Sequence, residues 1–481
     1  MIATLLLCWA LQSVALIPQP ARVDVTPGKD LNVRGGVPEA AVTICAAMRP
    51  EGYTLDIDRS GIRIQAGSPA GAFYARQTLS QLLPADPAAK PRLPYVHIED
   101  APAWDMRAMM LDCSRHFFTV PEIKRILDIL AAHKINTFHW HLTDSQGWRL
   151  EIKRYPELTR IGNYRPYTET WPTWKSDGVP VDGYYSQDEV REIVAYAAER
   201  FITVIPELDM PGHATAALAS YPFLGCKGEG YHVLTKWVID KDVYCPGKET
   251  TFEFLEGVIA EVAELFPGPW IHLGGDECKK DRWKSCPHCR QRIQDEHLPD
   301  EEALQSYFMR RVEQIVRRTG KKMLGWDELV QGGLSPTVAL TCRFGEASVR
   351  KVMDHGNRVL LCPGSHCYFD YYQDADFKKE PRAHGAPRVT TVETVWSLDP
   401  KRIYSAREQE FILGLECNLW TEYVPDFSHL QYMLLPRLDA FSEAAWTQGE
   451  RDWNDFRRRL DVQRQRYDAA GIRYAGHVFT R

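Results

Sequence analysis

Two neighbouring carboxylates, Asp276 and Glu277, are the first candidates for catalytic groups. They end the segment His272-Leu273-Gly274-Gly275-Asp276-Glu277, in which two glycines follow an apolar, strand-like run. Glycines at a strand end let a ligand or another segment approach the backbone closely. Carboxyl groups serve glycoside hydrolysis, where one protonates the leaving oxygen and a second group stabilises the positive charge on the anomeric carbon. A metal site or a solvated loop would use the same residues, so the doublet alone is not decisive.

The adjacency of the two carboxylates restricts the reaction they could catalyse. Side chains of neighbouring residues cannot easily stand on both sides of one scissile bond, as two ordinary catalytic carboxylates do. The doublet therefore favours a reaction in which the substrate's own 2-acetamido oxygen is the nucleophile, with Glu277 as the acid and Asp276 polarising the amide.

Other polar and aromatic residues follow the carboxyl ends of further apolar runs. They are Asp144, Glu207, Asp209, His213, Trp326, Asp327, Glu328, Tyr368, Asp370, Trp420 and Glu422. In an open sheet such residues would spread along an edge, whereas in a barrel all strand ends converge on one mouth. Their number favours the barrel.

The elements that must position these residues alternate between β-rich and helical patterns. Apolar runs at 135–141, 202–208, 270–274, 322–326, 338–342, 359–362 and 413–420 are separated by helical patterns at 121–133, 187–200, 251–266 and 302–318. Nearly continuous hydrophobic strands indicate a parallel sheet covered by helices. We therefore expect an α/β protein with a (β/α)8 TIM-type barrel over residues 101–450.

Two smaller units flank the predicted barrel. Alternating strands at 52–57 and 61–66, followed by an amphipathic helix at 70–83, predict a small α+β accessory domain over residues 17–100. Residues 451–481 are expected to form a C-terminal unit packing on the barrel, with a charged helix from Asp452 to Ala470.

Composition excludes several classes of protein. The 481 residues include 58 Lys and Arg against 64 Asp and Glu, a formal net charge of −6, so no positive field exists to hold nucleic acid. With 44% hydrophobic and 25% charged residues the chain is neither disordered nor fibrous. Residues 1–16 resemble a signal peptide, which predicts a periplasmic, secreted or lysosomal protein, and no other run is long enough to predict a membrane span.

Twelve cysteines leave several possibilities open. Cys226 and Cys245 are the pair most readily joined by a disulfide. Cys278 and the Cys286-Pro287-His288-Cys289 motif resemble a zinc site superficially, but one Cys-x-x-Cys without a second pair favours a loop disulfide or free thiols. No metal and no organic cofactor is predicted.

The motifs and their order resemble those of the β-N-acetylhexosaminidases of glycoside hydrolase family 20. The matching segments are 110–117, 138–144, 206–213, 274–277, 325–328, 368–370 and 419–422, while residues 52–82 are similar to the family's accessory domain. The resemblance covers roughly residues 24–475. Several independent motifs in one order make coincidence a poor explanation.

The resemblance implies roles for five catalytic residues. Glu277 would be the general acid and then the general base, which requires a partly desolvated carboxyl that is protonated at working pH. Asp276 would hold the acetamido nitrogen and Tyr368 would donate to the acetamido oxygen. Asp144 and His213 would form a pair that tunes the proton affinity of Glu277. The structural alternatives are loop residues and an ordinary core histidine.

The resemblance also implies a set of substrate-binding residues: Arg115, Trp326, Trp396, Asp370, Trp420 and Glu422. Arg115 would bind the outer hydroxyls of the terminal sugar, and the tryptophans would form the walls of the site. A surface ion pair and rim packing are the structural alternatives. Two positions depart from the family pattern: Cys342 replaces a usual tryptophan, which puts one wall of the acetamido pocket in doubt, and Ser145 replaces a usual aspartate.

The sequence thus predicts an exo-acting, retaining glycoside hydrolase that removes terminal β-linked N-acetylglucosamine, and also N-acetylgalactosamine if the pocket admits it, from glycans or chitin fragments. A lacto-N-biosidase-like enzyme that releases a disaccharide is a related alternative, favoured by the missing aromatic at Cys342. A carbohydrate-binding protein without turnover and a zinc-binding protein are alternatives of other classes. The oligomeric state is not predicted.

Overall fold

The computed structural model describes residues 14–34, 36–86, 88–385 and 387–480. The predicted signal peptide falls almost wholly outside the described residues, which include only its last three positions. Of these, Leu16 is buried in the core of the N-terminal domain, and its carbonyl accepts a hydrogen bond from Arg459.

The N-terminal domain is a five-stranded sheet covered by one helix. The sheet order is β1-β5-β3-β4-β2, and the strands are β1 (Arg22–Asn32), β2 (Ala41–Ile44), β3 (Tyr53–Asp58), β4 (Gly61–Ala66) and β5 (Arg92–Asp100). In β3 and β4 alternate side chains are buried, as expected for strands with one face on a core. The helix α2 (Pro69–Leu82) begins after Ser68, whose hydroxyl accepts from the backbone N–H of Ala70, and packs on β3 and β4.

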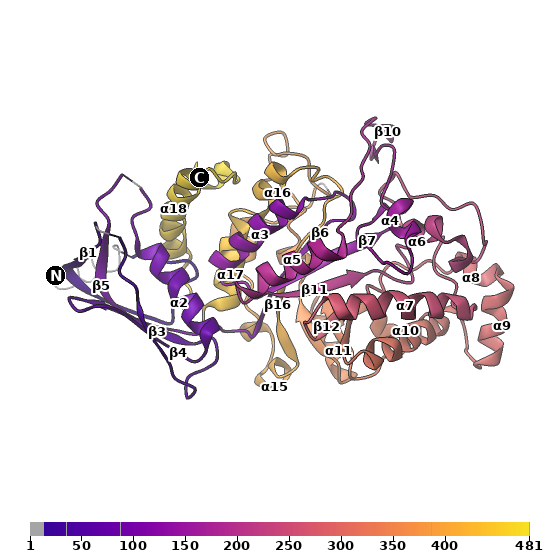
Figure 1. The fold of residues 1–481 in the computed structure, drawn as a ribbon, viewed down its shortest axis with the longest axis horizontal. Helices are drawn as coiled ribbons and strands as arrows, with labels where there is room; N and C mark the ends of the chain where they lie inside the picture. The colour runs from indigo at the N-terminus through magenta and orange to yellow at the C-terminus, as the bar shows by residue number, and fades with distance from the viewer. Residues whose placement is uncertain (1–13, 35, 87, 386, 481) are drawn as a thin grey trace.

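Eight parallel strands form a closed barrel after this domain (Figure 1). In sheet order they are β11 (Thr203–Leu208), β12 (Trp270–His272), β13 (Lys322–Trp326), β14 (Ala339–Cys342), β15 (Arg358–Leu361), β16 (Ile412–Leu419), β6 (Met106–Asp112) and β7 (Thr137–Asp144). Pairing of β7 with β11, from Thr203 opposite Thr137 onward, closes the ring. The predicted fold class is therefore confirmed.

Helices on the outside of the barrel follow most of the strands. The longer ones are α3 (Val120–Ala132), α5 (Gln187–Ala198), α7 (Glu249–Leu265), α10 (Glu301–Arg318), α11 (Glu346–Asp354), α16 (Phe427–Leu434) and α17 (Arg437–Trp446). A capping box of Ser186 and Glu189 starts α5, because each side chain accepts a hydrogen bond from the backbone N–H of the other residue. After β13 a 3-10 helix (Asp327–Gly332) takes the place of an α-helix, which is a local departure from the strict β/α alternation.

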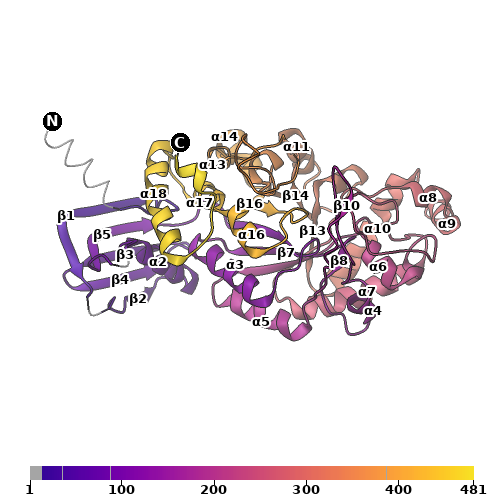
Figure 2. The ribbon, with the colours of Figure 1, turned by 90° about the horizontal axis from the view of Figure 1, so that it is seen from above.

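The C-terminal helix α18 (Trp453–Ala470) lies beside α2 of the N-terminal domain (Figures 1 and 2). Arg466 donates to the carbonyl of Gln81 at the end of α2, at 2.6 Å. Arg459 forms a buried ion pair with Glu443 of α17. The helix therefore packs on both the barrel and the accessory domain, which is more than the sequence predicted.

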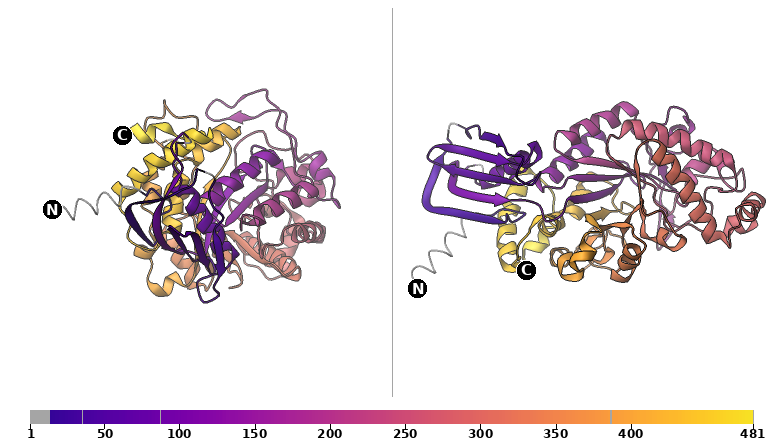
Figure 3. Two further views of the ribbon diagram at one scale, coloured as in Figure 1. Left: turned by 60° about the vertical axis from the view of Figure 1, so that its left-hand side comes forward. Right: turned by 90° about the horizontal axis from the view of Figure 1, so that it is seen from below.

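The N-terminal domain docks against the end of the barrel where the strands begin. Glu51 forms an ion pair with Arg107 of β6 at 2.7 Å and accepts from the side chain of Asn136, which precedes β7, at 3.1 Å. Figure 3 shows the sheet of this domain at one extremity of an elongated molecule. The carboxyl ends of the barrel strands, where barrel active sites are built, consequently face away from it. Within the described part of the chain, no helix combines the length and apolar character that crossing a membrane requires.

Candidate active site

A pocket of about 330 Å³ lies at the carboxyl ends of the barrel strands. All of the residues predicted for the site line it except Trp326 and Trp396: Arg115, Asp144, His213, Asp276, Glu277, Tyr368, Asp370, Trp420 and Glu422. The volume is at the lower end of the range for small-molecule sites, about 300–1,000 Å³. It therefore suits a ligand of about the size of one sugar unit.

The backbone around the carboxylate doublet is held in an unusual conformation. Gly274 has a φ of +62°, and a Cβ there would overlap the carboxylate of Asp209. Glu277 itself has a φ of 51°, which side chains rarely adopt. Its backbone N–H donates to Glu328 at 2.8 Å. The group that comes close to the backbone at these glycines is therefore the carboxylate of Asp209. The strained turn after them places Glu277 in the pocket wall.

Asp144, His213 and Glu277 form a chain of ionisable groups. Nδ1 of His213 lies 3.1 Å from Oδ1 of Asp144, and its Nε2 lies 3.5 Å from Oε2 of Glu277. Burial would lower the pKa of His213, but the negative charges of Asp144 and Asp209 raise it well above its usual value. Burial likewise opposes ionisation of Asp144, yet the positive charges of Arg115 and His213 lower its pKa. Asp144 and His213 therefore form an ion pair beside Glu277.

Glu277 does not have the raised pKa that we expected for a general acid. Burial does raise the pKa, but contact with His213 and the positive charges of Arg343 and Arg115 outweigh it and lower the pKa to about 2. The side chain is only partly buried, with 32% of its surface exposed. The expectation of a protonated Glu277 is wrong for the free protein, because the cations around the pocket favour the carboxylate.

Asp276 shows the opposite behaviour. Burial and the negative charge of Glu277 raise its pKa to about 6, although Arg343 and His213 oppose this effect. Its Oδ2 lies 3.5 Å from the guanidinium of Arg343. At mildly acidic pH the two neighbouring carboxyl groups therefore share one proton, which resides mainly on Asp276.

Several buried polar atoms of the pocket make no hydrogen bond within the described part of the chain. They are Oδ1 of Asp276, Oη of Tyr368, Oδ1 of Asp370 and Oε2 of Glu422. An unpaired buried polar atom costs about 1–3 kcal/mol, so such atoms are rare unless a ligand or water satisfies them. Their convergence on one pocket indicates a ligand with several hydroxyl or amide groups.

Comparison with known proteins agrees with this geometry. A family model described as "Glycosyl hydrolase family 20, catalytic domain" matches residues 104–449, and one described as "Glycosyl hydrolase family 20, domain 2" matches residues 18–101. The chain belongs to glycosyl hydrolase family 20.

Family 20 relatives are similar over most of the chain. A "Beta-hexosaminidase" of Porphyromonas gingivalis is 44% identical over 436 residues, which are 89% of this chain and 55% of that protein. A "Beta-hexosaminidase" of Akkermansia muciniphila is 32% identical over 94% of this chain and 90% of its own length. This chain thus spans about half the length of the Porphyromonas relative.

Solved structures of family 20 proteins share the fold. An exo β-N-acetylglucosaminidase from Vibrio harveyi in complex with N-acetylglucosamine has a TM-score of 0.86 and 31% identity, covering 96% of this chain and 78% of that one. An N-acetyl-β-hexosaminidase from Streptomyces plicatus in complex with Thio-NAglucal has a TM-score of 0.82 and 32% identity, covering 96% of both chains.

Arg115 and Trp420 lie where the family 20 resemblance predicts. The guanidinium of Arg115 contacts Asp144 at 2.8 Å and Asp112 at 3.1 Å, and it lies over the ring of Trp420 at 5.2 Å. Asp112 is the last residue of β6, so the end of this strand holds the arginine in place through the ion pair. One of the guanidinium nitrogens also approaches Glu422 to 3.8 Å, and Nε donates to Gln146 at 3.0 Å, so the protein holds the guanidinium on several sides at the pocket wall.

Trp326 supports the floor of the pocket without lining it. Its ring is fully buried, packs 5.8 Å from the ring of Trp420, and donates from Nε1 to Glu207 at 3.0 Å. Glu207 also contacts His141 at 2.6 Å, and His141 in turn contacts Asp144. Trp326 therefore acts on the site through Trp420 and this buried network.

Trp396 is not part of the site. It ends α13 (Val392–Trp396) and stacks near Trp453 and Phe456 of α18, while the guanidinium of Arg451 lies over its ring at 5.1 Å. The prediction of a substrate-binding role is therefore corrected: an apolar face of α18, distant in sequence, accounts for this tryptophan.

The two departures from the family 20 pattern have different outcomes. Cys342 is fully buried and does not line the pocket, whereas the next residue, Arg343, does. The guanidinium of Arg343 contacts Glu328 and lies 3.5 Å from both Asp276 and Glu277. The side chain of Ser145 takes no part in the histidine pair, but its backbone N–H donates to Oδ1 of Asp144, the oxygen that faces His213.

Sequence reasoning missed several residues that line the pocket. They are Gln146, Trp237, Val238, Ile239, Arg343, Tyr371, His384 and Arg388, whereas Asp209 was placed at the barrel mouth by its strand end but given no role. Arg343 follows a strand end and was open to the same argument as its neighbours. Trp237, Val238 and Ile239 lie in the middle of a long loop, and no periodicity or motif marks such positions.

Proposed function

We propose that this chain is an exo-acting, retaining β-N-acetylhexosaminidase that removes terminal, non-reducing N-acetylhexosamine from glycans or chitin fragments. The observation that carries the proposal is the placement of Glu277, Asp276 and Tyr368 around one sugar-sized pocket in which several buried polar atoms have no protein partner. The similarity to the β-hexosaminidases of Porphyromonas gingivalis and Akkermansia muciniphila supports it.

The first half of the reaction uses three side chains. The free Oδ1 of Asp276 accepts from the N–H of the 2-acetamido group, and the hydroxyl of Tyr368 donates to its oxygen. The oxygen attacks the anomeric carbon, the glycosidic bond breaks, and Glu277 gives its proton to the departing oxygen. An oxazolinium ring forms on the substrate.

The second half reverses the role of Glu277. The carboxylate takes a proton from water, and the resulting hydroxide equivalent opens the ring at the anomeric carbon from the face that the leaving group vacated. Two inversions give net retention of configuration. The imidazolium of His213, which Asp144 holds by its other ring nitrogen, faces Glu277 and stabilises its carboxylate form at the start of this step.

The acid form of Glu277 has to arise when the substrate binds. A sugar in the pocket excludes water from Glu277, and this desolvation raises its pKa. Asp276, meanwhile, is stabilised as a carboxylate by the amide N–H. We therefore infer that the proton shared by the pair moves from Asp276 to Glu277 on binding.

Pocket size favours release of one sugar over release of a disaccharide. The lacto-N-biosidase-like alternative needs room for a second sugar, and the loss of an aromatic at Cys342 would have provided it. Cys342 does not line the pocket, and Arg343 fills the space beside the doublet instead. A carbohydrate-binding protein without turnover would have no use for the Asp144–His213 pair beside Glu277.

Hydrolysis of 4-nitrophenyl N-acetyl-β-D-glucosaminide by the purified protein tests the proposal. We expect release of nitrophenol that falls by at least about 10³-fold in Glu277→Gln, and that declines steadily as the acetamido methyl is fluorinated, because fluorine weakens the amide oxygen as a nucleophile. Activity of Glu277→Gln close to that of the wild type would refute the role of Glu277.

A second measurement separates the two enzymes. Digestion of a β-linked tetrasaccharide with a terminal N-acetylglucosamine should give the monosaccharide and a trisaccharide first. Initial release of a disaccharide would favour the lacto-N-biosidase-like alternative. Binding of the sugar without hydrolysis of any substrate would favour the carbohydrate-binding protein.

A further inference from the structure

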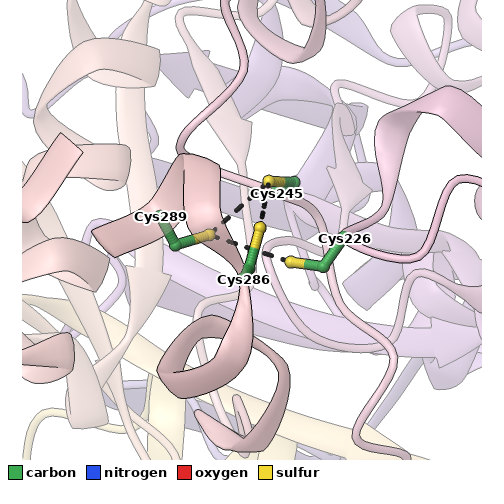
Figure 4. A group of neighbouring side chains, drawn as sticks. All are labelled: Cys226, Cys245, Cys286 and Cys289. Carbon is green, nitrogen blue, oxygen red and sulfur yellow. Dashed lines mark hydrogen bonds between the residues drawn. The ribbon is translucent and has the colours of Figure 1, made fainter. Parts of the chain in front are cut away.

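Four cysteines outside the pocket converge on one point (Figure 4). Cys226, Cys245, Cys286 and Cys289, the four-cysteine cluster, have sulfur atoms that all lie within 4.8 Å of one another. Cys245, Cys286 and Cys289 are buried, and Cys226 is half-buried. We propose that this cluster binds a structural zinc ion that fixes the loops around the active site.

The spacing of the sulfur atoms is that of a tetrahedral metal site. Sγ of Cys245 lies 3.5 Å from Sγ of Cys289 and 3.8 Å from Sγ of Cys286, and Sγ of Cys226 lies 3.8 Å from Sγ of Cys289. Four thiolates around zinc, with bonds of about 2.3 Å, are separated by edges of about 3.8 Å. In two disulfides each sulfur would have one partner at about 2.0 Å. Here Cys245 and Cys289 each have two sulfur neighbours at similar distances, which matches the tetrahedron.

Two pieces of local structure supply the ligands in pairs. An isolated antiparallel bridge between Gly225 and Tyr244 sets Cys226 and Cys245 side by side. Cys286 is the N-cap of α9 (Pro287–Asp295), and Cys289 lies in its first turn. The Cys-x-x-Cys spacing at a helix start turns both thiols to one side, which is typical of structural zinc sites.

The backbone around the cluster is fixed by bonds that need no metal. The backbone N–H of Cys245 donates to the carbonyl of Leu224 at 2.8 Å. Lys248 donates from Nζ to the carbonyl of Gly225 at 2.7 Å, and Trp283 donates from Nε1 to the carbonyl of Tyr244 at 2.9 Å. The ligands are therefore already positioned, so zinc binding loses little ordering entropy.

Close contact between the two loops supports the same conclusion. A Cβ at Gly247 would overlap the backbone of His288, so only glycine lets the two ligand pairs come this near. His288 itself is exposed. The zinc-site alternative from the sequence, with Cys278, Cys286, His288 and Cys289, shares Cys286 and Cys289 with this cluster, and the fold brings Cys226 and Cys245 to them in place of the other two.

The position of the cluster gives the metal a function. Cys226 and Cys245 close the loop whose middle residues, Trp237 to Ile239, line the mouth of the pocket. Cys286 and Cys289 belong to the segment that follows Glu277. One ion would therefore join the loop after β11 to the loop after β12, and it would restrict the freedom of the pocket wall.

Metal content is the direct test. Protein purified in a thiol reductant without added zinc, and dialysed against a weak chelator, should contain about one zinc per chain by inductively coupled plasma mass spectrometry. The double variant Cys286→Ser/Cys289→Ser should contain less than about 0.1. Cys45→Ser and Cys367→Ser remove thiols outside the cluster, and both should retain the full amount. Equal zinc in the double variant and the wild type would overturn the proposal.

Two further measurements keep the test decisive if the double variant fails to fold. The zinc K-edge absorption spectrum of the wild type should show four sulfur neighbours at about 2.3 Å, and nitrogen or oxygen neighbours would overturn the assignment. Protein purified without reductant and unfolded with a chelator should react with a thiol reagent at every cysteine. A deficit of four thiols would instead show two disulfides, and a full thiol count without zinc would show four free cysteines; either result would overturn the proposal.

Discussion

Asp276 and Glu277 are neighbours in sequence, yet the structure gives their carboxyl groups opposite properties. Asp276 is buried and Glu277 is partly exposed next to the cationic end of His213, so the pKa of Asp276 is raised to about 6 and that of Glu277 is lowered to about 2. A mechanism that needs an ionised Asp276 and a protonated Glu277 has to reverse this order.

Proton exchange on binding a neutral sugar should reveal that reversal. In the free protein at pH 5 the pair holds one proton on Asp276, and in the complex it holds one proton on Glu277, so the wild type should exchange almost none. In Asp276→Asn the only carboxyl group left in the doublet is Glu277, whose pKa is about 2 in the free wild type and should rise on binding. This variant should take up about one proton at pH 5, and its affinity should increase as the pH falls toward 2.

Calorimetry of N-acetylglucosamine binding in buffers of different ionisation enthalpy measures the exchange. Uptake of a full proton by the wild type at pH 5 would contradict the internal transfer. Asp399→Asn, a change at a half-buried helix cap that does not line the pocket, is a matched control and should behave as the wild type does.

Tyr368 offers a prediction about a single hydrogen bond. Its buried hydroxyl has no partner within the described part of the chain. In the proposed mechanism this hydroxyl donates to the amide oxygen while that oxygen attacks the anomeric carbon. Tyr368→Phe should lower kcat by about 10²–10³-fold with little change in stability, because it removes one donor to the reacting group. Tyr372→Phe, at a neighbouring tyrosine that does not line the pocket, should lose far less. Similar kcat values for the two variants would contradict the role of Tyr368.

At the scale of elements, the end of β12 shows how a strand places a catalytic group. Two glycines with positive φ follow this short strand, and Asp209 from the end of β11 occupies the space that a side chain on Gly274 would need. The turn therefore depends on the contact between Gly274, after β12, and Asp209, after β11. The surrounding helices and strands keep these two strand ends in contact.

Gly274→Ala should disrupt the turn, whereas Gly320→Ala is the matched control. Gly320 also has a positive φ of +80°, but a Cβ there would meet nothing within 4 Å. Both variants should lose about 1 kcal/mol of unfolding free energy from the backbone conformation alone. Only Gly274→Ala should lose a further ~1–3 kcal/mol, and at least about tenfold in kcat/KM, because Asp209 and the doublet must move. Urea unfolding and initial rates measure both, and full activity of Gly274→Ala would contradict this account.

At the scale of the whole molecule, a buried polar cluster joins the accessory domain to the barrel. Lys134, just before β7, donates to Asp100 at 2.9 Å and to the hydroxyl of Tyr53 at 2.9 Å. Trp446 at the end of α17 also donates to Asp100, at 2.9 Å. All four residues are buried, so the docked arrangement depends on every partner being present.

Lys134→Met should uncouple the two domains. It leaves Asp100 as a buried charge without its cation, which costs about 3–5 kcal/mol. Thermal unfolding should change from one transition to two, with the accessory domain melting first, while the activity at low temperature persists because the pocket lies at the other end of the barrel. Arg63→Met, which breaks an exposed pair with Asp58, should leave the melting curve almost unchanged. A single unshifted transition in Lys134→Met would show that the cluster does not couple the domains.

The sequence predicted the fold class and most of the site because both depend on local patterns. Buried parallel strands appear as continuous apolar runs, and polar residues placed just after them must meet at the mouth of a barrel, as Glu277, Asp144 and Tyr368 do. The same reasoning did not predict β1, β2 and β5, since these strands are short, exposed or interrupted by proline. It also identified no strand at β6, the first barrel strand along the chain, so only seven of the eight barrel strands were recognised as apolar runs. It also misplaced Trp396, because an aromatic residue has the same local pattern whether it faces a ligand or another helix.

Only the tertiary structure decided the properties that depend on neighbours distant in sequence. The pKa of Glu277 is set by Arg343, Arg115 and His213, and no local pattern shows that these cations surround it. The four-cysteine cluster joins two ligand pairs separated by some forty residues of chain. Electrostatic fields and metal geometry depend on distances in space, which the sequence encodes only through the complete fold.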